Sequence, residues 1–154
     1  MRKLLRNKEK KDLYNLFDKE KIQNKRIESY KDVEGELIFI EGEPMLYKFN
    51  KNWIYTINCL YKGLNLNTYK SITIDKGAIR FISNGADVMR PGITHIEENI
   101  EKNEIIIIKE ETHNKILAIG SSLYNTNELK ETKTGKVIKN ILYVGDNIWK
   151  LKIF

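Results

Sequence analysis

Residues 74–93 read IDKGAIRFISNGADVMRPGI, and this stretch decides the fold of the second half of the chain. The preceding residues 71–74 alternate as a short strand. Asp75 is a favoured N-cap residue, and Gly85 stands where a helix over about 76–84 needs a left-handed residue after its last turn. The stretch therefore predicts a strand, a capped helix and a glycine stop in that order.

Short strands and turns continue beyond this stretch. Strands are predicted at 93–96, 104–109 and 115–121, and Asn125 with Glu128 forms the pattern of a capping box at the start of a short helix. Gly135 and Gly145 separate the last short strands. A compact half with many short strands and two small helices is typical of a closed or nearly closed β-barrel.

The first half of the chain predicts a small mixed unit. Leu13, Leu16 and Phe17 follow helical spacing, which predicts an amphipathic helix over about 9–21. A hairpin is predicted from strands at 36–41 and 45–49 around the turn Gly42-Glu43-Pro44. Residues 52–61 fit either a strand or a buried helical turn. The whole chain is therefore expected to be α+β.

Composition limits the kind of protein. The 154 residues suffice for one ordinary domain or two small ones, and 41% hydrophobic with 31% charged residues argues against disorder. The single cysteine, Cys59, excludes an internal disulfide. Cys59, His95 and His113 lie too far apart for a zinc motif, so no metal or other cofactor is expected.

No membrane or export signal is recognised. The N-terminal residues 1–8 are basic and lack an apolar segment, and the longest aliphatic run, Ile105–Ile108, is far too short to cross a bilayer. We therefore expect a cytoplasmic protein with no membrane partner.

The positive charge is concentrated near the N-terminus. The net charge is +6, and residues 1–31 hold 11 Lys or Arg against 5 Asp or Glu, whereas residues 32–154 hold 16 of each. Such a segment suits a phosphate backbone or an acidic protein surface. A solvated helix or a frayed tail explains it equally well.

Residues 74–93 resemble the opening of a PUA domain, with a strand, a helix that carries Gly-Ala, and then a second Gly-Ala and Pro-Gly. Residues 135–151, GKVIKNILYVGDNIWKL, resemble the ending of the malignant-T-cell-amplified-sequence family and its archaeal relatives. Residues 35–40 with the following hairpin resemble the pre-PUA unit of that family. The resemblance implies a pre-PUA-like α+β domain over 1–70, with the basic N-terminal segment, and a PUA pseudo-β-barrel with two short helices over 71–154.

The resemblance also implies a function. Proteins of this family bind RNA in translation, so we expect a ribosome-associated factor in initiation, reinitiation or recycling that contacts rRNA or tRNA on the small ribosomal subunit. Eukaryotic members join a density-regulated protein, and a similar partner is a candidate here. PUA domains also occur on RNA-modifying enzymes, which leaves an alternative: an RNA-recognition accessory of a separately encoded modifying enzyme. A third interpretation is a protein adaptor whose basic N-terminal helix binds an acidic partner.

The family's usual contact region places the RNA site on the first PUA helix and the following loop. The expected RNA-binding residues are Lys76, Gly77, Arg80, Asn84, Gly85, Arg90 and Gly92. The cations would contact phosphates, and the glycines would let backbone amides approach them. Physical chemistry alone favours a solvated helix face with capping glycines; the resemblance reverses that preference. Arg90 departs from the small or sulfur-containing residue of many relatives, and the acidic loop 97–104 predicts that RNA avoids that face.

Other side chains carry weaker signals. Tyr143 and Trp149 near an expected barrel rim are able to stack bases, although tryptophan in a small barrel is more often a core residue, and the same holds for Trp53 and Phe81. No nucleophile with a base and no pair of carboxylates is recognised, so we expect a binding protein without catalytic residues.

Overall fold

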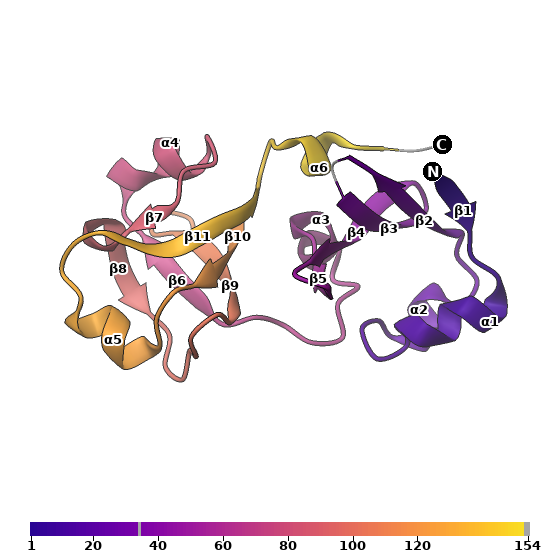
Figure 1. The fold of residues 1–154 in the computed structure, drawn as a ribbon, viewed down its shortest axis with the longest axis horizontal. Helices are drawn as coiled ribbons and strands as arrows, with labels where there is room; N and C mark the ends of the chain where they lie inside the picture. The colour runs from indigo at the N-terminus through magenta and orange to yellow at the C-terminus, as the bar shows by residue number, and fades with distance from the viewer. Residues whose placement is uncertain (34, 153–154) are drawn as a thin grey trace. The chain divides into compact units, whose positions relative to one another are not determined.

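The computed structural model describes residues 1–33 and 35–152. The chain divides into two compact units. Unit 1 contains residues 1–68 and the C-terminal segment from Asn147, and unit 2 contains residues 69–146. Each unit consists of a β-sheet with a few short helices, so the expected α+β class is confirmed (Figure 1).

Unit 1 is built on a five-stranded antiparallel sheet whose strands follow one another in chain order. The strands are β1 (Arg2–Leu4), β2 (Ile27–Asp32), β3 (Gly35–Ile40), β4 (Glu43–Phe49) and β5 (Asn52–Tyr55). The predicted hairpin is confirmed as β3 and β4. Its turn lies at Glu41 and Gly42, which both have positive φ, and Pro44 is a buried residue of β4 instead of a turn residue.

Residues 52–61, which fit a strand or a helix, form both. β5 ends at Tyr55, and the next residue, Thr56, begins α3 (Ile57–Lys62) because its side chain accepts a hydrogen bond from the backbone N–H of Cys59. Gly63 ends this helix in the left-handed conformation. A capping residue therefore divides the apolar run into two elements.

The prediction of a single helix over 9–21 is wrong. The structure has α1 (Asn7–Lys10), the 3₁₀ turn η1 (Lys11–Leu13) and α2 (Lys19–Ile22). Asp18 starts α2 afresh because its carboxylate accepts from the backbone N–H of Glu20 at 2.9 Å. Of the three apolar residues of the pattern, Leu13 and Phe17 are buried and Leu16 is partly buried.

Unit 2 contains a six-stranded sheet in the order β7-β11-β10-β9-β6-β8, in which only the β6–β9 pair is parallel among the described strands. The strands are β6 (Ser71–Ile74), β7 (Val88–Met89), β8 (Ile93–Ile96), β9 (Ile105–Glu110), β10 (Ile116–Ser122) and β11 (Lys136–Tyr143). The strands predicted at 71–74, 93–96, 104–109 and 115–121 are thus present within about one residue of their expected ends.

The two short helices expected in unit 2 are present. The Asp75 carboxylate accepts from the backbone N–H of Ala78 at 2.9 Å and starts the 3₁₀ turn η2 (Lys76–Ala78), which continues into α4 (Ile79–Ile82). Gly85 has φ +91°, as the predicted glycine stop requires. The capping box of Asn125 and Glu128 starts α5 (Thr126–Glu131).

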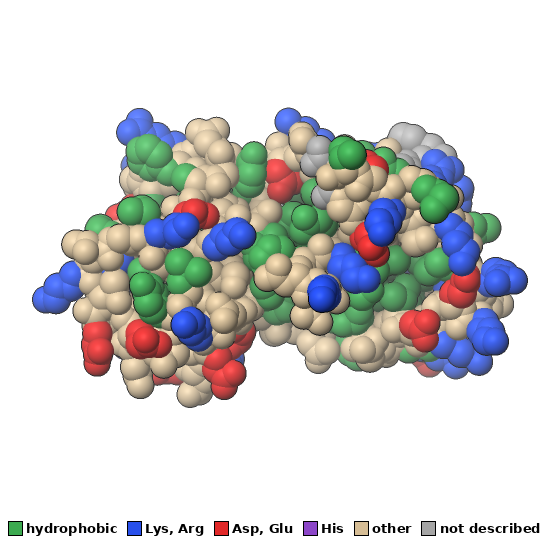
Figure 2. Space-filling view, viewed as in Figure 1, with side chains coloured by type: hydrophobic (Ala, Val, Ile, Leu, Met, Phe, Trp, Pro, Cys, Tyr) green, Lys and Arg blue, Asp and Glu red, His purple; other side chains and the backbone are tan. Residues whose placement is uncertain are grey.

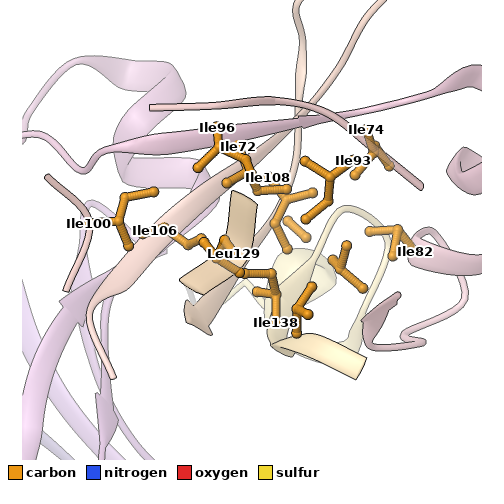
Figure 3. Close-up of a cluster of buried hydrophobic side chains, with 13 residues drawn as sticks. Ile72, Ile74, Ile82, Ile93, Ile96, Ile100, Ile106, Ile108, Leu129 and Ile138 are labelled. Carbon is orange, nitrogen blue, oxygen red and sulfur yellow. The ribbon is translucent and has the colours of Figure 1, made fainter. Parts of the chain in front are cut away.

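Isoleucines dominate the core of unit 2. Nine of the thirteen buried side chains in its main hydrophobic cluster are isoleucines, and they come from strands, helix α4 and the loop after β8 (Figure 3). Burying one such side chain fully contributes about 1.5–3 kcal/mol. The β-branched side chains suit strands as well as a packed interior, so one residue type fixes both the sheet and its core.

The C-terminal segment belongs to unit 1. Helix α6 (Asn147–Lys150) buries Ile148, and the Trp149 ring meets the Tyr61 ring of α3 edge-on at 6.1 Å. The Asn58 side-chain amide also donates to the Trp149 carbonyl at 3.5 Å. The predicted second domain over 71–154 includes this segment, but the structure groups it with residues 1–68, where α3 supplies its aromatic contact.

Candidate nucleic-acid interface

A groove of about 610 Å³ opens beside α4 in unit 2. All but one of its lining residues come from residues 75–92, the same stretch that decides the fold; the exception is Lys136 at the start of β11. The Asp75 cap, α4, β7 and the 3₁₀ turn η3 (Arg90–Gly92) therefore build both the local structure and the groove.

Two large apolar side chains are exposed at this groove. Phe81 on α4 is 53% exposed and Met89 on β7 is 52% exposed. The interpretation of Phe81 as a core residue is wrong, because Ile82 takes the buried position of α4 instead. Single exposed apolar residues need no explanation, but two that line one groove indicate a binding surface.

Cationic side chains lie next to this apolar surface. Lys76 and Arg80 are exposed, and none of the described residues forms an ion pair with either. They line a second hollow that shares Gly77 with the groove. The Arg80 guanidinium carbon lies 4.7 Å from the centre of the Phe81 ring, a cation–π distance that holds the charge beside the aromatic face.

Lys136 is a groove cation that the sequence analysis missed. Its ammonium lies 3.4 Å from the Asp87 carboxylate, which also accepts the backbone N–H of Asn140 at 2.8 Å. Lys136 reaches the groove because β11 pairs with β7, with Lys136 opposite Met89. This pairing spans almost fifty residues of sequence, and no local motif marks it.

The three glycines of the expected site differ in their roles. A Cβ on Gly85 would lie 2.9 Å from the Tyr143 ring, and one on Gly92 would lie 3.2 Å from the Ala78 Cβ. Gly77 has no such neighbour within 3.4 Å and no positive φ. Gly85, with its positive φ and this close approach, is required by the fold, and Gly92 is tightly packed, whereas Gly77 leaves space at the groove that a side chain would fill.

Asn84 takes part in ending the helix. Its side-chain amide donates to the Arg80 carbonyl at 2.9 Å, and it does not line the groove. The structure therefore places Lys76, Gly77, Arg80 and Gly92 at the groove or its adjoining hollow, and it places Asn84 and Gly85 in the loop that closes α4.

Arg90 points away from the groove. Its Nε donates to the Leu129 carbonyl at 2.6 Å and its Nη1 to the Ile93 carbonyl at 3.3 Å. The side chain thus joins α5 to the start of β8 and lines a separate pocket with His95 and Lys130. We therefore assign Arg90 to stabilising the fold of unit 2.

Replacing Arg90 with alanine tests this assignment. Two carbonyls would lose a charged donor, so we expect unit 2 to lose about 1–3 kcal/mol of unfolding free energy. Urea unfolding followed by circular dichroism measures the loss. RNA affinity at 20 °C, where the variant is folded, should stay within about twofold; a tenfold loss of affinity without loss of stability would return Arg90 to the interface.

The other aromatic candidates are structural. Tyr143 packs against the core cluster of unit 2 and against Gly85. Trp149 contacts Tyr61 and belongs to unit 1, so it is not part of the sheet of unit 2. Trp53 is half-buried, with the Lys48 ammonium 5.3 Å from its ring centre.

Potential nucleophiles and metal ligands do not converge. Burial raises the pKa of the Cys59 thiol to about 12, which keeps it protonated at neutral pH. His113 is exposed beside Glu110, and His95 lines the pocket of Arg90. Within residues 1–33 and 35–152, no three His, Cys, Asp or Glu side chains form a cluster suited to a metal ion.

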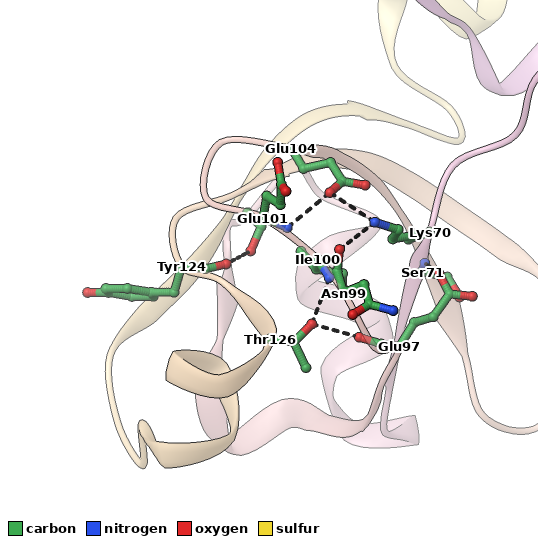
Figure 4. A network of polar contacts seen from close by, with 10 residues as sticks. Lys70, Ser71, Glu97, Asn99, Ile100, Glu101, Glu104, Tyr124 and Thr126 are labelled. Atoms are coloured by element: carbon green, nitrogen blue, oxygen red, sulfur yellow. Dashed lines mark hydrogen bonds and ion pairs between the residues drawn. The ribbon is translucent and has the colours of Figure 1, made fainter.

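The acidic loop 97–104 is tied into unit 2 by a polar network (Figure 4). The Lys70 ammonium contacts Glu104 at 3.4 Å and donates to the Asn99 carbonyl, while the Thr126 hydroxyl donates to the Glu97 carbonyl at 2.9 Å and accepts the Ile100 N–H at 2.8 Å. Figure 2 shows acidic side chains gathered at the end of unit 2 that carries α5, opposite α4. Phosphates would be repelled from this end.

None of the helices in the described part of the chain has the length and apolar character needed to cross a membrane.

Comparison with known proteins identifies the family. The family model described as "PUA domain" matches residues 70–144, which lie inside unit 2. An uncharacterized protein of Methanocaldococcus jannaschii is 41% identical over 117 residues, which cover 76% of this chain and 71% of that protein. This chain belongs to the PUA-domain proteins. The expected resemblance is confirmed.

Further relatives of this PUA-domain protein include one named for the translation machinery. Translation machinery-associated protein 20 of Schizosaccharomyces pombe is 32% identical, with 74% of this chain and 65% of that protein covered, so the match spans slightly less than two thirds of the relative. Malignant T-cell-amplified sequence 1 of Danio rerio is 25% identical over 77% of this chain and 67% of that protein.

Solved structures agree with the PUA assignment. A hypothetical protein of Pyrococcus horikoshii has 27% identity and a TM-score of 0.74, with 97% of this chain and 98% of that chain covered. A conserved PUA domain protein of Thermoplasma acidophilum has 23% identity and a TM-score of 0.76 over 97% and 98% of the two chains. The second likeness concerns the fold alone.

Proposed function

We propose that this chain is a translation-associated RNA-binding protein that holds RNA in the groove beside α4. The groove carries the proposal, because it combines exposed apolar side chains with a lining cation, Lys136, and adjoins a hollow whose cations, Lys76 and Arg80, have no carboxylate partner among the described residues. The relatives named for the translation machinery support the association with translation. Binding and positioning account for the activity without a covalent step.

The chemistry of the groove fits RNA with at least one unpaired base. Unstacked bases bind aromatic side chains and flanking apolar groups, which Phe81 and Met89 offer. Lys76, Arg80 and Lys136 would neutralise the adjoining phosphates. The space at Gly77 would let the RNA backbone approach the protein backbone closely.

Within this proposal, the protein acts in the cytoplasm as a factor on the small ribosomal subunit. It would contact rRNA or tRNA during initiation, reinitiation or recycling, and a density-regulated-protein-like partner would be its protein neighbour. An accessory for a tRNA- or rRNA-modifying enzyme is the alternative. Sedimentation of cell lysate separates the two, because the first role requires the protein to migrate with small subunits and the second requires it to copurify with the enzyme.

Replacing Phe81 with alanine tests the groove directly. Loss of one stacked base contact costs about 1–3 kcal/mol, so RNA affinity should fall roughly 5- to 160-fold. Stability should hardly change, because the side chain is more than half exposed. Fluorescence anisotropy with a labelled single-stranded RNA measures the affinity. Tyr124→Ala, which also removes an exposed aromatic ring, is the control; equal affinity in both variants and the parent would remove Phe81 from the site.

A further inference from the structure

The two units differ sharply in charge. Unit 1 holds 16 Lys or Arg and 10 Asp or Glu, whereas unit 2 holds 11 of each. The entire net charge of +6 therefore lies in unit 1, outside the unit that contains the groove. A charge difference of this size between two parts of one chain indicates an electrostatic role for the basic part.

Some of the cations of unit 1 form ion pairs with carboxylates of the same unit. Glu28 is buried and lies 2.6 Å from the Arg2 guanidinium and 2.9 Å from that of Arg26. Lys3 pairs with Glu9 at 2.6 Å. These pairs hold β1 and α1 to the sheet, so the cations in them are structural and are not available to a ligand.

Among the cations of unit 1 outside these pairs, four lysines are grouped on the N-terminal helices and turn. Lys8 on α1, Lys11 on η1, and Lys19 and Lys21 on α2 are all exposed, and no carboxylate among the described residues pairs with them. We call these four residues the lysine platform. Lys19 lies 5.8 Å from the Tyr14 ring centre and Lys21 is 3.4 Å from the Gly63 carbonyl, contacts that leave both charges uncompensated.

The platform is part of the folded unit. Leu13, Phe17 and Ile22 anchor its turns in the interior, with relative exposures of 5%, 0% and 0%. The Lys10 ammonium donates to the Lys25 carbonyl at 2.7 Å and so ties α1 to the segment after α2. Strand β1, which precedes the segment, pairs with β2, which follows it, so both ends of the segment are fixed in the sheet. The interpretation of this segment as a frayed tail is therefore wrong.

We infer that the lysine platform binds the phosphate backbone of a nucleic acid, as a site separate from the groove. Lysine ammoniums are compact point charges, which suffice for phosphate and read no base. Protein interfaces are depleted in lysine and need apolar contacts at their centre. No large hydrophobic side chain is exposed between residues 7 and 25, which argues against an acidic protein as the ligand. Figure 2 shows the basic side chains at the end of unit 1 that carries α1 and α2.

The test compares two variants of the full chain with equal net charge. One replaces Lys8, Lys11, Lys19 and Lys21 with glutamine. The control replaces Lys102, Lys115, Lys133 and Lys152 with glutamine; these lysines are likewise exposed and free of ion pairs among the described residues. The probe is a labelled 20-nucleotide single-stranded RNA of mixed sequence, titrated between about 50 and 300 mM KCl, where counterion release controls affinity.

Loss of the platform should weaken binding and flatten its salt dependence. Single-stranded contacts contribute a slope of about −0.7 per phosphate, so four lost contacts should reduce the slope of log K against log salt by about 3. Affinity at about 100 mM KCl should fall at least tenfold. The control variant should keep the slope of the parent.

Equal slopes and affinities in the two variants would overturn the inference, because general charge would then explain binding. Competition by polyglutamate as strongly as by RNA would also overturn it in favour of an acidic protein partner. The inference does not rest on the groove: if Phe81→Ala keeps full affinity while the platform variant loses it, the proposed groove fails and the platform stands. If the platform variant keeps full affinity while Phe81→Ala loses it, the platform inference fails and the proposed groove stands.

Discussion

Replacing both Lys76 and Arg80 with glutamate is expected to lower RNA affinity at least about 100-fold. Each charged hydrogen bond to phosphate contributes about 1.5–3 kcal/mol, and reversal adds repulsion to the loss. Both side chains are exposed and unpaired among the described residues, so the fold should tolerate the change. Anisotropy titration at fixed salt measures the affinity, and circular dichroism verifies the fold.

Lys102→Glu with Lys115→Glu is the matched control for this reversal. These exposed lysines belong to the same unit and the change in net charge is equal, but neither lines the groove. The control should lose less than about fivefold at 150 mM salt, where screening acts over about 8 Å. Similar losses in the two double variants would contradict a localised site beside α4.

Phe17→Ala is expected to cost unit 1 about 3–5 kcal/mol of unfolding free energy. Phe17 is fully buried, and its ring meets that of Tyr55 edge-on at 6.0 Å. The variant would leave a cavity beneath the turns that carry the lysine platform. Both tryptophans, Trp53 and Trp149, belong to unit 1, so tryptophan fluorescence during urea unfolding reports on this unit.

Tyr14→Ala controls for the loss of an aromatic ring in the same segment. Tyr14 is only partly buried, so its removal should cost less than about 1.5 kcal/mol. Equal destabilisation by the two variants would show that Phe17 does not anchor the segment in the way its burial implies.

The sequence predicted unit 2 well because its signals are local. Asp75 and Gly85 each act within a few residues, through a cap and a left-handed stop, and the structure has both. The isoleucine-rich strands are also read from short windows. The same stretch lines the groove, which is why the expected site included Lys76, Gly77 and Arg80.

The roles of Lys136, Arg90 and Trp149 were not predicted, because each depends on a contact with a residue far away in the sequence. Lys136 enters the groove only through the pairing of β11 with β7. Arg90 lies in the right segment, but its guanidinium is bound by the Leu129 carbonyl, 39 residues further along the chain. Trp149 returns to unit 1 through Tyr61. Local patterns carry no information about such partners.

The helix predicted over 9–21 shows a different limit. Its apolar spacing correctly identified Leu13 and Phe17 as buried, but the same spacing is satisfied by two short helices and a 3₁₀ turn. Asp18 caps a new helix at α2 and so divides the segment. A capping residue inside an amphipathic pattern therefore indicates a break more strongly than the length of the pattern indicates one helix.

Ultraviolet cross-linking of the tagged protein in its native cell tests the central claim most directly. Mass spectrometry of the adducts identifies the cross-linked residues, and sequencing identifies the RNA. We expect adducts on the groove peptide that contains Phe81 and Met89, joined to small-subunit rRNA or tRNA. RNA adducts confined to other parts of unit 2, with none on that peptide, would contradict the proposed interface.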